Sequence, residues 1–271
     1  MKRVVNSEFC KEIGDLSSDD MKLDNNRMKF ILKKKFRHMS GRRRLGLVWL
    51  VLDPIVVSVV YLFIFTVLRA STRVESIFIG ITLFRLMQVS LKLGMNSVQD
   101  FTGGLKAERV RTRVLTGAMV RYRIIDNFLQ SGGVALILFF GYNVSPSGIG
   151  IFLLTAQLIG FLSEGVGMNL APLAKKIPDV TNLVTYLLMI LFYASPALYP
   201  LSFTNGIHYY LNTLHPFTYF VETSRYFAGL DSEILNLDLR FFGVFLFILL
   251  LLIWRGYSLI DNLRWRMTTW S

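Results

Sequence analysis

The chain lacks the residues from which most catalytic and metal sites are built. It has one cysteine, Cys10, so no intramolecular disulfide can form, and its three histidines are dispersed along the sequence. No H-E-x-x-H or G-x-S-x-G motif occurs. There is also no Gly-Lys dipeptide, so the chain cannot form the P-loop that cradles nucleotide phosphates. We therefore expect no catalytic residue, no metal and no cofactor bound by this chain.

Acidic residues are also scarce, with 18 Asp and Glu against 30 Lys and Arg and a formal net charge of +12. The basic residues are concentrated before and between long apolar runs, and 53% of all residues are hydrophobic. This pattern is typical of cytoplasmic loops that face anionic headgroups. It argues against a nucleic-acid partner and in favour of a membrane protein.

Six apolar segments are candidates for membrane-spanning helices, which need about 20 residues. They are residues 45–68, 77–98, 124–142, 149–173, 180–201 and 241–257. Basic clusters at 33–35 and 42–44 precede the first segment and predict a cytoplasmic amino terminus. The second-to-third connection, which includes Arg121 and Arg123, and the fourth-to-fifth connection are basic, whereas the third-to-fourth connection carries no charge. This alternation predicts that both termini are cytoplasmic.

The predicted fold is therefore an all-α integral protein of the cytoplasmic (inner) membrane with six transmembrane helices. Residues 1–28 are expected to form a disordered cytoplasmic extension, residues 29–260 the six-span domain, and residues 261–271 a cytoplasmic tail. Residues 29–44 carry eight Lys or Arg, no acid, and apolar residues near helical spacing. This favours an amphipathic helix at the membrane interface, and a simple charge cluster that sets orientation is the alternative.

The connection between the fifth and sixth segments is long and rich in aromatics. Prolines break it into pieces, which predicts short re-entrant helices, because backbone at membrane depth must be helical or covered by protein. Glu222 and Arg225 are spaced to pair on one helical face. We expect an outer gate that includes Tyr209, Tyr219, Tyr226 and Arg225, and an ordinary extracellular loop with an aromatic belt is the alternative.

Charged residues also lie inside the apolar segments. Arg85 and Lys92 are seven residues apart and share a helical face with Gln88. An unpaired charge at the bilayer centre costs about 2.5–3.5 kcal/mol, so such residues usually face a cavity or a partner. We expect Arg85, Lys92, Gln88 and Glu164 to line a conduit that favours an anionic cargo. Asp53 and Glu164 are both possible partners for the bases, and snorkelling of Lys92 is the alternative.

Three groups of residues carry a family resemblance. Residues 44–54 read RLGLVWLVLDP; Phe84-Arg85 is followed by MNSV at 95–98; and FYASPALYP at 192–200 precedes His215-Pro216-Phe217 and Arg225. In this order and spacing they resemble permease subunits of type-2 ABC exporters that move capsular polysaccharide, O-antigen or teichoic acid. His215 stands where that family commonly has Asn.

The resemblance implies a homodimer of this chain that exports a glycan and works with a separate P-loop ATPase, which would hold ATP and Mg²⁺. The ATPase would dock on the second-to-third connection, at Lys106, Glu108, Arg109, Arg111 and Arg113. Membrane lipid would surround the complex. Two alternatives remain open: an exporter of drugs or small lipophiles on the same scaffold, and an integral membrane enzyme acting on lipid-linked sugars.

Overall fold

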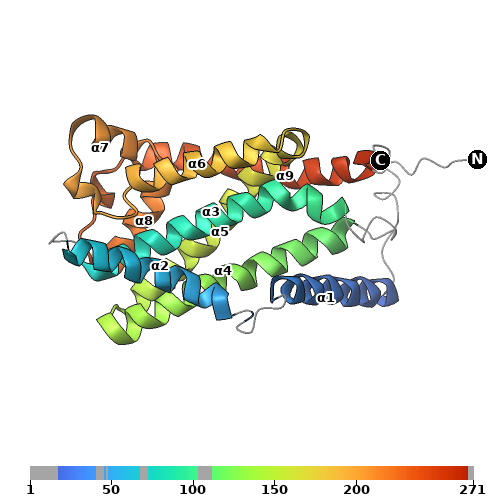
Figure 1. Ribbon diagram of the computed structural model, residues 1–271, viewed down its shortest axis with the longest axis horizontal. Helices are drawn as coiled ribbons and strands as arrows, with labels where there is room; N and C mark the ends of the chain where they lie inside the picture. Colours follow the sequence, from blue (N-terminus) through green and yellow to red (C-terminus); the bar gives the residue numbers. More distant parts are fainter. Residues whose placement is uncertain (1–17, 41–45, 47, 68–72, 103–111, 268–271) are drawn as a thin grey trace, which may run out of the picture.

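The computed structural model describes residues 18–40, 46, 48–67, 73–102 and 112–267 of the 271-residue chain, and every regular element in those ranges is a helix. Besides α1 (Ser18–Ser40), six helices of 16 or more residues run roughly along the long axis of the molecule (Figure 1). They are α2 (Val48–Val67), α3 (Val74–Thr102), α4 (Thr112–Tyr142), α5 (Pro146–Lys176), α6 (Asp179–Ala194) and α9 (Leu239–Met267). The prediction of an all-α fold is confirmed for the described part of the chain.

Four of these helices are long and apolar enough to cross a membrane. The qualifying stretches are Val74–Ser97, Val114–Tyr142, Pro146–Lys176 and Leu239–Leu259. The other two are apolar but shorter, Val48–Ile64 in α2 and Asp179–Ala194 in α6. The expected fifth segment continues to Leu201, but α6 ends at Ala194 because Ser195 is extended and Pro196 follows it.

The centre of the bundle is the crossing of α3 with α5. Every α3 side chain from Ile77 to Phe84 is buried. Further along, the two backbones approach closely at Gly94 and Gly167, where a Cβ on Gly94 would lie 2.9 Å from Gly167 Cα and would overlap the carbonyl oxygen of Glu164. Small residues allow this contact, which matters in a bilayer because lipid supplies no hydrophobic force between helices.

Helix α1 (Ser18–Ser40) differs from its prediction. It begins at Ser18 rather than Lys29, so residues 18–28 are helical and not a disordered extension. Met28 packs against Val114, Leu115 and Ala118 of α4, and this contact with the bundle stabilises the earlier start. The ammonium of Lys35 adds a cation–π contact, 4.5 Å from the ring centre of Tyr122.

Between α6 and α9, the chain folds into the 3₁₀ helix η2 (Leu201–Phe203), α7 (Gly206–Thr213), α8 (Pro216–Phe227) and the 3₁₀ helix η3 (Ile234–Asn236). Helices α7 and α8 lie at one end of the bundle, opposite α1 (Figure 1). The amino-terminal end of α8 lies deep, since the rings of Phe217 and Phe84 are 5.2 Å apart and Phe84 is about 15 Å along α3 from its start at Val74. The other end of α8 reaches that start, where Arg225 contacts Ser76.

Candidate functional site

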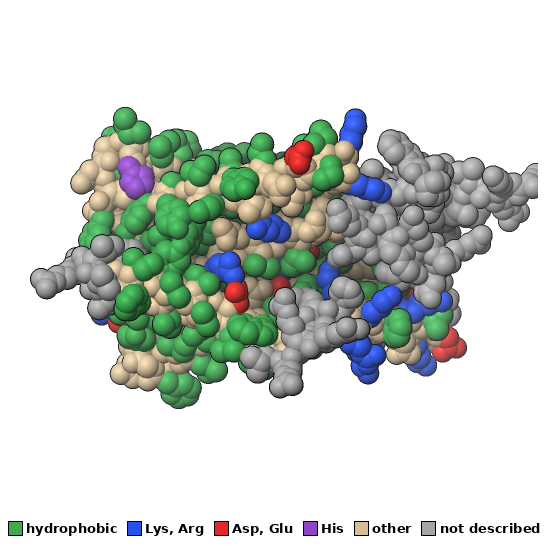
Figure 2. Space-filling model, in the orientation of Figure 1, with side chains coloured by type: hydrophobic (Ala, Val, Ile, Leu, Met, Phe, Trp, Pro, Cys, Tyr) green, Lys and Arg blue, Asp and Glu red, His purple; other side chains and the backbone are tan. Residues whose placement is uncertain are grey.

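A groove over α3 brings together three of the predicted conduit residues and an acid from α2. Helices α2 and α6 lie on either side of α3, and Figure 2 shows basic side chains reaching the surface midway between them, with an acidic side chain beside one. The Arg85 guanidinium forms an ion pair with the Asp53 carboxylate, and the two side chains are 30% and 46% exposed. Asp53 is therefore the partner of Arg85, a pairing that the sequence left open.

Lys92 carries the uncompensated charge of this groove. It lies about 10 Å from Arg85 along α3, is half-buried, and has no ion pair or hydrogen bond to any of the described residues. Gln88, between them, donates from Nε2 to the backbone oxygen of Leu188 at 3.5 Å and so links α3 to α6. With Arg85 offset by Asp53, the groove keeps one positive charge.

Toward the α7 end, the groove opens into an apolar cavity of about 520 Å³ between α2 and α6. The hydroxyls of Tyr61 and Tyr193 are 3.2 Å apart across it, and the Tyr61 ring packs edge-on against Phe192 at 5.2 Å. On the side of the cavity away from α7, α6 exposes a face of large apolar side chains: Leu183, Tyr186, Leu187 and Ile190. The groove therefore has a polar centre and apolar walls.

Glu164, the fourth predicted conduit residue, is not part of this groove. It is 3% exposed, and its Oε2 accepts a hydrogen bond from Arg123 Nε at 2.8 Å inside the bundle. Arg123 Nη1 lies 3.2 Å from Asp126 Oδ2 and donates to Ser90 Oγ at 3.1 Å. Gln130 completes the cluster with a 3.1 Å bond to Asp126.

This cluster also corrects the expected position of Arg123. The sequence placed it in a cytoplasmic connection, but α4 begins at Thr112 and Arg123 is fully buried. The helix extends beyond the apolar run because the charge of Arg123 is balanced by two acids. A polar strip at helical spacing, Arg123, Asp126 and Gln130, was the available signal.

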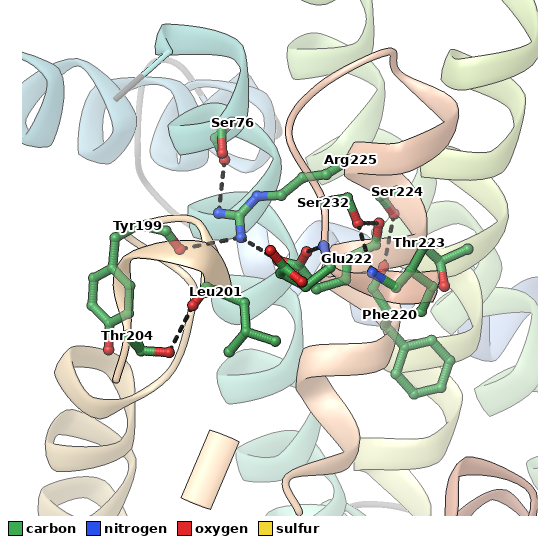
Figure 3. A network of polar contacts seen from close by, with 12 residues as sticks. Ser76, Tyr199, Leu201, Thr204, Phe220, Glu222, Thr223, Ser224, Arg225 and Ser232 are labelled. Atoms are coloured by element: carbon green, nitrogen blue, oxygen red, sulfur yellow. Dashed lines mark hydrogen bonds and ion pairs between the residues drawn. The ribbon is translucent and has the colours of Figure 1, made fainter. Parts of the chain in front are cut away.

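Figure 3 shows the network that holds α8 in place. The predicted pair is confirmed, since Arg225 Nη1 donates to Glu222 Oε1 at 2.9 Å and both side chains are fully buried. Arg225 also donates to the backbone oxygens of Tyr199 at 3.2 Å and Ser76 at 3.3 Å. Glu222 Oε2 accepts from the backbone N–H of Glu233 at 2.8 Å. In this conformation Arg225 therefore positions three segments and does not face a passage.

Tyr199 and His208 close the end of α6. The Tyr199 hydroxyl donates to the backbone oxygen of Ala194 at 2.9 Å, and His208 Nε2 lies 2.9 Å from both groups. These contacts satisfy carbonyl groups that the end of α6 would otherwise leave unpaired.

The three predicted gate tyrosines do not form one cluster. Tyr209 and Tyr219 line the same cavity, whereas Tyr226 is 46% exposed and packs on Phe227. Tyr219 is buried and stacks on Phe242, with ring centres 5.0 Å apart. Burial is the main cause that raises the pKa of Tyr209 and of Tyr219, so both phenols are protonated at neutral pH.

The predicted ATPase contacts lie largely outside the described residues. Lys106, Glu108, Arg109 and Arg111 belong to the undescribed range 103–111, and Arg113 is described only as part of the α4 backbone. Their role stays a prediction. Within the described ranges, no three His, Cys, Asp or Glu side chains are grouped so that they could hold a metal ion.

Comparison with known proteins gives the family. The profile of the ABC-2 type transporter family matches residues 26–228, well over half of the chain and from within α1 to just past α8. The chain belongs to the ABC-2 type transporter family: it is a multi-pass membrane protein and a permease subunit of an ABC exporter, a class that pairs with an ATP-binding subunit. No curated protein is similar enough to match the chain. The predicted family is thus confirmed, and the polysaccharide subfamily stays a prediction.

Proposed function

We propose that this chain is the membrane subunit of an exporter that moves a polysaccharide or a lipid-linked glycan across the cytoplasmic membrane. A separate P-loop ATPase supplies the energy, since no Gly-Lys pair is present to form a phosphate-binding loop. The observation that carries the proposal is the groove of α3, where Lys92 has no counter-charge among the described residues and where an apolar cavity begins one turn of α2 beyond Asp53. An anionic head and an apolar tail would be complementary to such a groove.

The proposed topology has six spans, with α2 and α6 added to the four longer helices, and cytoplasmic termini. Helix α2 has 20 residues and is about 30 Å long, which matches the hydrocarbon core of a bilayer. Helix α6 has 16 residues and is about 24 Å long. The missing length is supplied by residues 195–200, whose backbone is covered by α3 and α8. Helices α7 and α8 then re-enter from the outer side.

A homodimer would complete the conduit. In a single subunit the groove opens sideways, and Lys92 would face lipid at a cost of about 2.5–3.5 kcal/mol. A second copy facing the first encloses both grooves, so that Lys92 and the Arg85–Asp53 pair line a shared polar path. The exposed apolar face of α6 provides the contact surface around that path.

An anionic glycan fits this path better than the alternatives. Its pyrophosphate linkage or acidic sugars would be attracted to Lys92, and electrostatic attraction is strong where water is scarce. A cationic lipophilic drug would be repelled by the same charge, although the apolar cavity beside Tyr61 would suit its rings. A membrane enzyme would need clustered acids or histidines open to substrate, whereas the acids near Arg123 are buried and engaged.

The test uses the chain reconstituted with its ATPase partner in proteoliposomes. Each probe is added in turn: a polyprenyl-pyrophosphate oligosaccharide, or a lipophilic drug cation. We expect the pyrophosphate lipid to stimulate ATP hydrolysis, and Lys92→Ala to reduce that stimulation several-fold. Arg240→Ala removes an exposed charge outside the groove and serves as the matched control. Stimulation by the drug cation alone would refute the glycan proposal. ATP hydrolysis by the purified chain without its partner would refute the proposal that a separate subunit supplies the energy.

A further inference from the structure

We propose that the cavity between α7, α8, η3 and the start of α9 is a second binding site, separate from the groove, for a neutral sugar ring. Its volume is about 330 Å³. Sites for small molecules range from about 300 to 1,000 Å³, so this one suits one or two sugar rings. Its access from outside the cell rests on the proposed function, but the binding itself does not.

The cavity is lined by three tyrosines, of which Tyr219 is buried and Tyr210 is exposed. Tyr219 is fixed because it stacks on Phe242 with an interplanar angle of 14° and donates to the backbone oxygen of Asp238 at 3.3 Å. Tyr209 and Tyr210 meet edge to face, with ring centres 6.2 Å apart. Tyr210 is 69% exposed, so its ring is available to a ligand. The C–H face of a pyranose can stack on such rings while its hydroxyls reach polar groups at their edges.

Polar groups with free capacity lie around these rings. Asp238 Oδ1 accepts from the backbone N–H of Arg240 at 2.9 Å and caps α9, and Oδ2 has no partner among the described residues. The amide nitrogen of Asn236 donates to Glu233, which leaves the Asn236 carbonyl oxygen as an acceptor. Sugar hydroxyls are donors, and they match this set of acceptors and the tyrosine hydroxyls.

The charge of the cavity selects against anions. None of the residues that line it is Lys or Arg, Asp238 is part of the wall, and Glu233 lies next to it. A phosphate or a uronic acid would meet repulsion here, whereas it would be attracted in the Lys92 groove. The ligand is therefore a neutral hexose or N-acetylhexosamine, as a unit of the exported chain or as the headgroup of an outer-leaflet glycolipid.

The test uses the full chain in phosphatidylcholine nanodiscs, because detergents with sugar headgroups would compete. Binding is followed by saturation-transfer difference NMR with methyl glycosides of neutral hexoses and N-acetylhexosamines, and with methyl glucuronide as the anionic counterpart. We expect saturable binding of at least one neutral glycoside and at least tenfold weaker binding of glucuronide.

Two variants and one control assign the site. Tyr210→Ala should weaken the bound glycoside about tenfold, because it removes an exposed stacking surface. Asp238→Asn keeps the α9 cap and should reduce the discrimination against glucuronide. Tyr226→Ala removes a tyrosine of α8 that is also exposed, 46% against 69% for Tyr210, but does not line the cavity, and it should change nothing.

No saturable binding of any neutral glycoside would overturn the proposal, as would equal effects of the Tyr210 and Tyr226 variants, or preference for glucuronide. A full chain that binds a neutral glycoside in this way but shows no stimulation by pyrophosphate lipid would keep the sugar site and reject the proposed cargo. If pyrophosphate lipid stimulates ATP hydrolysis but no neutral glycoside binds, the proposed cargo is kept and the sugar site is rejected.

If glycolipid in the nanodisc displaces the methyl glycoside through the same residues, the headgroup is the natural source. If only a soluble oligosaccharide of the exported glycan does so, the source is the passing chain.

Discussion

Adding a single methyl group at the crossing of α3 and α5 should destabilise the bundle. A Cβ on Gly167 would overlap the carbonyl oxygen of Leu91 and would lie 3.0 Å from Gly94 Cα. Both obstacles are backbone atoms, so relief requires the two helices to separate. Gly150, on the same helix, has nothing within 4 Å of an added Cβ and provides the matched control.

The expected difference follows from two opposite effects. Gly→Ala at an unobstructed helix position stabilises by up to about 1 kcal/mol, and inserting a methyl into a packed interior costs about 1–3 kcal/mol. The propensity gain applies to both variants, so Gly167→Ala and Gly150→Ala should differ by the packing cost alone, about 1–3 kcal/mol in unfolding free energy. For a chain of this size that is roughly 2–12 °C in apparent melting temperature.

The assay is thermal unfolding of the detergent-purified chain, followed by the loss of the folded peak in size-exclusion chromatography after heating. Gly94→Ala should behave like Gly167→Ala, because its Cβ would meet Gly167 Cα at 2.9 Å. Equal melting temperatures for the Gly167 and Gly150 variants would show that the helices are not in backbone contact. The placement of Lys92, two residues from Gly94 on α3, would then need revision.

Three further outcomes are expected. Glu222→Gln should lower unfolding free energy by about 3–5 kcal/mol, because it leaves the buried Arg225 guanidinium without its counter-charge, and replacing both residues by Met should restore most of it. Burial lowers the pKa of His215 from 6.5 to about 4. The stability of the protein should therefore fall as pH drops from about 6.5 toward 4, by at most about 1.4 kcal/mol per pH unit. Melting curves recorded at several pH values should show that His215→Asn flattens this dependence. In a variant without the native cysteine, a cysteine placed at the exposed Ser147 should react with an impermeant thiol reagent in intact cells. A cysteine placed at the exposed Pro178 should not react. The reverse result would refute the six-span orientation.

Patterns in the sequence predicted the features that depend on residues close together along the chain. The helices followed from apolar runs, and the Glu222–Arg225 pair followed from its spacing of three residues. The Arg85–Asp53 pair joins α3 to α2 and could only be offered as one of several pairings, because spacing along a chain says nothing of which helices adjoin.

Other features depended on three-dimensional packing alone. A basic residue next to an apolar run has the same sequence pattern whether it faces the cytoplasm or a buried acid, so the sequence alone predicts that Arg123 lies in a loop. The start of α1 was placed too late because its stability depends on the contact of Met28 with α4. Thr204 lies in the connection that follows α6 and is only 6% exposed, and its hydroxyl donates to the backbone oxygen of Leu201 at 2.7 Å.

The bonds from Arg225 to Ser76 and Tyr199 fasten the start of α3 to α8. With Gly94 as a pivot, Ser76 lies at the end of an arm about 27 Å long, and a tilt of only 5° moves it by about 2 Å. That displacement is enough to break a 3.3 Å hydrogen bond between a guanidinium and a carbonyl oxygen. A tilt of α3 about Gly94 would therefore separate its start from α8, so a movement applied near the other end of α3 would be transmitted to α8.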